Sequence, residues 1–159
     1  MSQANVNWPR WVFASVCKHF DDNKSSLTLF IEGQHRKTRT LKDFAELRVD
    51  GPYLTEVSKG VWKLFIEVNV LLQSAMDDTS FHRIHTNAGI IVAAFTGIPV
   101  YKYGDGVDDD KSLLGCLQIV SDARGKERIQ VSHFGRIDTG TPLMQATVEG
   151  HYEITFLTV

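Results

Sequence analysis

The longest regular pattern in the chain is an alternation of apolar and polar residues over GVWKLFIEVNVLLQS, residues 60–74. The even positions are all apolar: Trp62, Leu64, Ile66, Val68, Val70 and Leu72. A period of two predicts a strand with one buried face, about twice as long as the usual 5–6 residues. The odd positions are mainly polar, but Phe65 and Leu71 interrupt them. These two side chains are either ordinary surface scatter or contact points for a neighbouring subunit.

The same alternation returns over residues 146–156 and predicts a second long strand near the end of the chain. Shorter apolar runs predict further strands at residues 27–32, 44–49, 98–103, 113–120 and 129–134. Asp50-Gly51-Pro52 has the composition of a turn. Residues 53–57 then lead through Ser58-Lys59-Gly60 into the long strand, which predicts a hairpin.

Two segments carry apolar residues at helical spacing. The first begins at Trp8-Pro9, and its apolar face comprises Trp8, Trp11, Val12, Val16 and Phe20. The second follows the capping residues Asp77, Asp78 and Thr79. Its predicted buried face comprises Phe81, Ile84, His85, Ala88, Ile91, Val92 and Phe95. Gly97 and Pro99 then mark its end.

These elements predict a single α+β domain over residues 1–159, with a mostly antiparallel β-sheet of long strands and two helices packed on one face. A length of 159 residues, 43% of them hydrophobic, fits one core of ordinary size. No apolar run approaches the roughly 20 residues that a membrane helix needs, so we expect no membrane partner. Cys17 and Cys116 both lie in apolar patterns and are expected to be buried free thiols of a protein folded in a reducing cytoplasm.

The histidines are the main candidates for chemistry. His82 and His85 lie three residues apart on the second helix, after Asp77 and Asp78, a spacing that can place metal ligands together. One packed and one exposed histidine is the commoner outcome of such a pattern. His133 and His151 have no nucleophile motif near them. We therefore expect no catalytic residues, no metal and no cofactor.

Two charged segments suggest docking rather than catalysis. The segment GQHRKTRT contains Arg36, Lys37 and Arg39, and an acidic run contains Asp108, Asp109 and Asp110. Each is readily explained as a solvated loop. A head-to-tail ring would also allow the basic segment of one subunit to meet the acidic segment of its neighbour. The net charge of −2 gives the whole chain no attraction for nucleic acid.

The order of these features resembles the tail terminator and neck proteins of long-tailed bacteriophages. The likeness spans roughly residues 8–159: an amphipathic helix, a strand with a basic loop, RVDGPYLTEVSKGVWKLFIEVNVLLQS, the helix FHRIHTNAGIIVAAF, and a strand-rich part ending in ATVEGHYEITFLTV. It rests on element order, because no sharp motif accompanies it.

The resemblance implies a virion protein, assembled in the host cytoplasm, that forms a ring, typically a hexamer. Such a ring caps the tail-tube protein at its head-proximal end, stops tube growth and joins the tail to the head connector or adaptor protein. DNA passes through its lumen without specific binding. No active-site residues are implied, and Phe65, Leu71 and the two charged segments are the candidate contacts.

Other functions stay open at this point. Another phage neck, head-completion, stopper or baseplate ring subunit would show the same pattern. A small-ligand-binding α+β module would use His133 and His151 as pocket residues. A small metal-dependent hydrolase would use His82, His85 and Asp78.

Reversing the charge of the basic segment tests the proposed pairing of charged loops. Arg36→Glu with Arg39→Glu should weaken assembly, because the variant segment would repel the acidic segment of a neighbour. Size-exclusion chromatography with light scattering measures the oligomer, and an unchanged mass would count against this contact.

Overall fold

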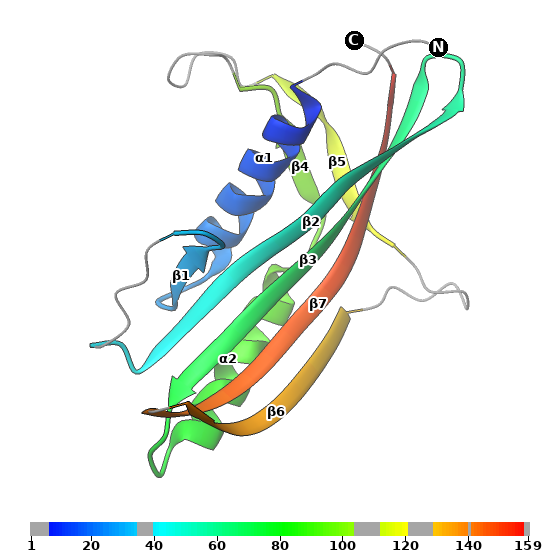
Figure 1. Ribbon diagram of the computed structural model, residues 1–159. Helices are drawn as coiled ribbons and strands as arrows, with labels where there is room; N and C mark the ends of the chain where they lie inside the picture. The colour runs from blue at the N-terminus through cyan, green and yellow to red at the C-terminus, as the bar shows by residue number, and fades with distance from the viewer. Residues whose placement is uncertain (1–6, 35–39, 104–111, 121–128, 140, 158–159) are drawn as a thin grey trace.

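The fold is built on long strands that run across the whole molecule (Figure 1). The structure, a computed structural model, describes residues 7–34, 40–103, 112–120, 129–139 and 141–157. Its elements follow the order α1 (Trp8–Asn23), β1 (Thr28–Ile31), β2 (Asp43–Ser58), β3 (Val61–Ala75), α2 (Ser80–Ala94), β4 (Ile98–Tyr101), β5 (Leu113–Ile119), β6 (Ile129–Thr139) and β7 (Thr141–Leu157). The predicted α+β class is therefore confirmed.

The strands form one seven-stranded sheet in the order β1-β2-β3-β7-β5-β4, and β6 pairs with β7. All pairs are antiparallel except β1 with β2, which is parallel. The centre of the sheet is the pairing of β3 with β7, which is continuous from Val61 opposite Leu157 to Ala75 opposite Leu143. The two long alternating strands recognised in the sequence are thus direct neighbours.

The alternation in β3 and β7 places one face of the sheet in the core. Leu64, Ile66, Val68, Val70 and Leu72 on β3 are fully buried. On β7, Ala146, Val148 and Tyr152 are fully buried as well, and Gly150 between them is also buried. Both helices cover this face (Figure 1), as predicted. The opposite face of β2, β3 and β7 has no helix over it among the described residues.

Aromatic contacts fix the helices on the sheet. Trp8, at the start of α1, stacks on Phe156 with ring centroids 3.7 Å apart. At the other end of α1, Phe20 meets Phe95 edge-on at 5.0 Å. The buried Tyr152 hydroxyl donates a hydrogen bond of 2.9 Å to the Thr96 carbonyl, and burial raises the pKa of this phenol. Each helix is therefore anchored to the last strand of the chain.

An arginine ties the start of α2 to the start of β2. The Arg83 guanidinium donates to the Asp43 carboxylate at 3.2 Å and to the Asp77 carboxylate at 2.7 Å. Asp77 also accepts hydrogen bonds of 2.8 Å from the Thr79 hydroxyl and from the Thr79 backbone N–H. Together with the bonds from Arg83, they lower the pKa of Asp77 to about 2. The carboxylate expected before the helix is present, although it acts through this turn and Arg83 rather than as a side-chain cap.

The predicted turn at Asp50-Gly51-Pro52 is wrong. β2 continues through these residues, and its register against β3 shifts by one position between Asp50 and Tyr53. Gly51 adopts a φ of +104°, and a Cβ there would lie 3.0 Å from the Phe65 carbonyl oxygen. The turn composition thus marks a β-bulge inside a long strand. The chain reverses at Lys59-Gly60, so the predicted hairpin itself is confirmed.

Three side chains expected in the core are exposed. Phe81 and His85 belong to the first turns of α2 and are exposed, whereas Ile84 and Ala88 beside them are buried. Cys116 is exposed because Leu117, its neighbour on β5, takes the buried side of the strand. Cys17 is buried as predicted, and burial raises the pKa of its thiol to about 11.

Gly150 is the position where the core leaves no room for a side chain. A Cβ there would lie 2.6 Å from two ring carbons of Phe95. Gly150→Ala should lower the free energy of unfolding by about 1–3 kcal/mol, since the ring or the strand must shift. Gly89→Ala, on an open part of α2 with nothing within 4 Å, should raise it by about 0.5–1 kcal/mol. Urea unfolding of both variants measures the contrast, and equal values would contradict the packing described.

Candidate interaction surfaces

The uncovered face of the sheet carries a row of aromatic rings across three strands. Phe65 on β3 lies between Tyr53 on β2, at a centroid distance of 6.3 Å, and His151 on β7, at 5.6 Å. The His151 ring is nearly parallel to the Phe65 ring, with an interplanar angle of 19°. Tyr53 is 56% exposed. Phe65 is thus part of an aromatic surface rather than an isolated apolar residue. We call Tyr53, Phe65 and His151 the aromatic row.

Carboxylates surround the aromatic row. The imidazole of His151 lies between Glu67, 3.7 Å from Nδ1, and Glu149, 3.4 Å from Nε2. Asp50 stands directly opposite Glu67 in the β2–β3 register, and like charges in such a position repel each other. A further glutamate, Glu153, pairs with the Lys63 ammonium at 2.8 Å. The row is therefore apolar in the middle and negative at its border.

Leu71 lies on the same face but apart from the aromatic row. It stands opposite Glu46 on β2 and Thr147 on β7, and is half-buried. Phe65 and Leu71 are six positions apart, which corresponds to about 20 Å along a strand. The Glu46 carboxylate is buried and accepts a 2.9 Å hydrogen bond from Arg48. The two predicted contact residues therefore belong to different parts of one face.

The charged segments fall outside the described residues. Arg36, Lys37 and Arg39 lie in the segment 35–39, and Asp108, Asp109 and Asp110 lie in the segment 104–111. Their pairing across subunits stays a prediction.

The four histidines considered for chemistry do not form one site. His85 stacks on His133 of β6, with ring centroids 4.2 Å apart and an interplanar angle of 13°. Metal ligands bind through lone pairs in the ring plane, and the lone pairs of stacked parallel rings do not converge on one ion. His133 is opposite Ala146 and faces the helices, whereas His151 is on the uncovered face. The described part of the chain has no group of three or more His, Cys, Asp or Glu that could hold a metal.

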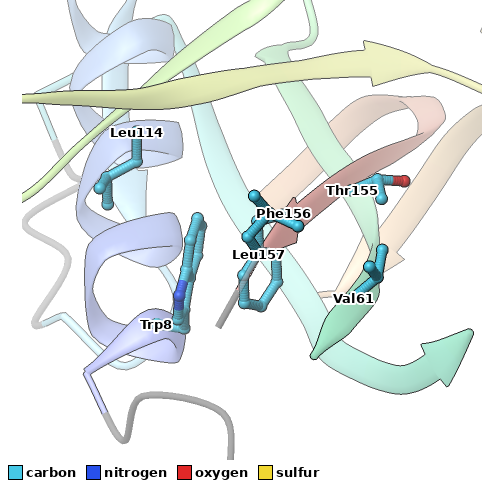
Figure 2. A pocket seen from close by; sticks show the side chains of 6 residues that line it. All are labelled: Trp8, Val61, Leu114, Thr155, Phe156 and Leu157. Carbon is cyan, nitrogen blue, oxygen red and sulfur yellow. The ribbon is translucent and has the colours of Figure 1, made fainter. Parts of the chain in front are cut away.

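An open apolar depression of about 360 Å³ lies where α1, β3, β5 and β7 meet (Figure 2). Trp8 and Phe156 form its centre, and Leu114, Val61, Thr155 and Leu157 complete the lining. The Leu157 side chain is 68% exposed at its border. Sequence patterns do not indicate this depression, because its residues come from four separate elements. It contains none of the histidines or charged residues considered above.

No protein-family model matches the chain, and no curated protein matches it. None of the described helices is long and apolar enough to cross a bilayer.

The His85–His133 stack predicts a pH dependence of stability. Burial lowers the pKa of His133, and the nearby His85 lowers it further. The unfolded chain, with a histidine pKa near 6.5, therefore binds a proton more readily, and the stability due to His133 is lost as the pH falls below about 6.5. His133→Phe retains a stacking ring that cannot take a proton. Its melting temperature should fall less between pH 7.5 and pH 5.5 than that of the wild type, by about 1–3 °C.

His82→Phe is the matched control, because His82 is exposed on α2, the helix that carries His85, and makes no ring contact with the described residues. Thermal unfolding should show the wild-type pH dependence in this variant. Identical pH dependence of His133→Phe and the wild type would refute the effect of the stack.

Proposed function

We propose that this protein is a structural subunit of a homo-oligomeric ring in the neck or tail of a long-tailed bacteriophage, of the tail terminator kind. The observation that carries the proposal is the uncovered face of β2, β3 and β7, with the aromatic row at its centre. A sheet of such long strands, with helices on one side only, leaves a large surface for a neighbouring protein.

The length of β3 and the exposed side chains of the β2–β3 hairpin support this proposal. At about 3.3 Å per residue, β3 is roughly 50 Å long, more than a compact core of this size needs. Its first residues and the end of β2 form a hairpin that projects past α1 and α2 (Figure 1). Tyr53 and Val57 in this hairpin are more than half exposed. Exposed apolar side chains that are gathered rather than scattered are typical of a contact surface.

The phage assignment rests on the resemblance in element order. The amphipathic first helix, the long hairpin, the second helix and the strand-rich last third are all present in the structure. In this function the partners are further copies of the chain, the tail-tube protein and the head connector or adaptor. DNA passes through the ring without specific binding.

Phe65→Asp tests the uncovered face. Phe65 is half-buried, and the added carboxylate would stand beside Tyr53 and opposite Glu153 in the register. The ring should fail to assemble while the monomer stays folded, because the side chain lies outside the helix-covered core. Light scattering gives the mass, and circular dichroism checks the fold.

Phe81→Asp is the matched control, since Phe81 is 67% exposed on α2 and far from the aromatic row. It should assemble like the wild type. A wild-type protein that stays monomeric at high concentration, alone and with tail-tube protein added, would overturn the proposed function. A ring formed equally well by Phe65→Asp would show that this face is not the contact.

A further inference from the structure

Besides the terminal strands β1 and β4, two strands of the sheet have an edge that no described strand covers. β1 covers β2 only from Phe44 to Leu47, so Arg48–Ser58 pairs with β3 alone. On the other side of the sheet, β6 pairs with β7 alone. Free edges present unpaired backbone N–H and C=O groups and readily add another strand.

Bulges limit the part of each edge that can pair regularly. On β2, register shifts lie between Asp50 and Tyr53 and between Glu56 and Ser58, which leaves residues 53–56 regular. On β6, the shift between His133 and Gly135 separates two regular segments, residues 129–133 and 135–139. Such interruptions protect edges from indiscriminate pairing, so a partner must match a short segment.

We propose that residues 53–56 of one copy pair with residues 129–133 of the next copy, so that the sheet continues from subunit to subunit. This inference rests on the proposed homo-oligomeric ring and adds a contact between sheet edges to the contact through the uncovered face. β2 and β6 run in opposite directions, because each neighbouring pair from β2 through β3 and β7 to β6 is antiparallel. Two copies in the same orientation therefore bring the two edges together as an antiparallel pair.

The side chains fit this pairing in one register. Leu54 and Val131 both stand on the helix side, since they are opposite the buried Leu64 and Val148. Placing Leu54 opposite Val131 joins these two exposed apolar residues on one face. Thr55 then meets Gln130, and Tyr53 meets Ser132, on the other face.

Because β2 and β6 are different surfaces, the contact is heterologous, and its repetition gives a ring if the rotation closes.

The position of the two segments within the sheet favours closure. Leu54 is opposite Leu64 of β3. Val131 is opposite Val148 of β7, which is itself opposite Val70 of β3. Each contact therefore shifts the next copy by six residues, roughly 20 Å along the strands. The four strands from β2 to β6 are about 19 Å wide. A shift of about 20 Å over this width would tilt the strands by about 45° from the ring axis, at the upper end of the range found in closed sheets.

A charge exchange tests the register. Leu54→Lys and Val131→Glu should each raise the concentration at which half of the protein is assembled by at least about tenfold, because an unpaired charge would face an apolar partner. In the double variant, every contact joins the introduced ammonium of one copy with the introduced carboxylate of the next. Assembly should return to within about threefold of the wild type, as measured by light scattering over a dilution series.

Phe13→Lys provides the control, because Phe13 is an exposed apolar residue on α1, away from both edges. Alone it should leave assembly unchanged, and combined with Val131→Glu it should not rescue it. If the wild type assembles and the single variants assemble equally well, or the double variant is not rescued, the edge contact is wrong while the proposed ring stands. A wild type that never assembles would instead remove the proposed function and the contact together.

Discussion

The uninterrupted pairing of β3 with β7 is the constraint on which the rest of the structure depends. Side chains alternate between the faces of a strand, so a slip of one residue would move every core residue of that strand to the other face. Fifteen consecutive positions, from Val61 opposite Leu157 to Ala75 opposite Leu143, keep the two alternating patterns in phase. The apolar stripe of each strand then joins the other into one surface, on which both helices pack.

That surface accounts for the close packing on one side of the sheet and the exposure on the other. Phe95 lies over Gly150, where no larger residue fits, and Trp8 lies on Phe156. On the uncovered side, Asp50 opposes Glu67, and His151 stands between two glutamates. Like charges on neighbouring strands cost stability in an isolated subunit. The contact proposed for this face would cover the exposed aromatic rings that lie beside these carboxylates.

Much of this fold is predictable from the sequence because its strands are long and alternate strictly. The alternation identified the strands and the buried residues of β3 and β7, and the helical spacing identified α1 and α2. The turn assigned to Asp50-Gly51-Pro52 failed because a turn and a bulge demand the same backbone freedom, and only the partner strand distinguishes them. Phe81 and His85 were misplaced for a related reason. Periodicity defines the inner face of a helix but does not show which side chains at the border of that face are covered.

The candidate surfaces were less predictable, since each joins residues that are distant in the sequence. Phe65 was visible as an apolar interruption of a polar face, whereas its neighbours Tyr53 and His151 depend on the register of two further strands. The stack of His85 on His133 joins a helix to an edge strand 48 positions away. The apolar depression around Trp8 needs four elements at once. Interruptions of a regular pattern are thus a usable signal for a contact, but its extent requires the sheet order.

The bulges of β2 and β6 have a common explanation, because both lie in strands with an uncovered edge. A long, flat and fully regular edge would pair with any exposed strand. Here Gly51 and Val57 interrupt β2, and Phe134 interrupts β6, at the borders of two short regular segments. The interior pairing of β3 with β7 has no such interruption. Regularity is therefore kept where the chain pairs with itself and restricted where it meets solvent, as expected if each edge is to accept one particular strand and reject others.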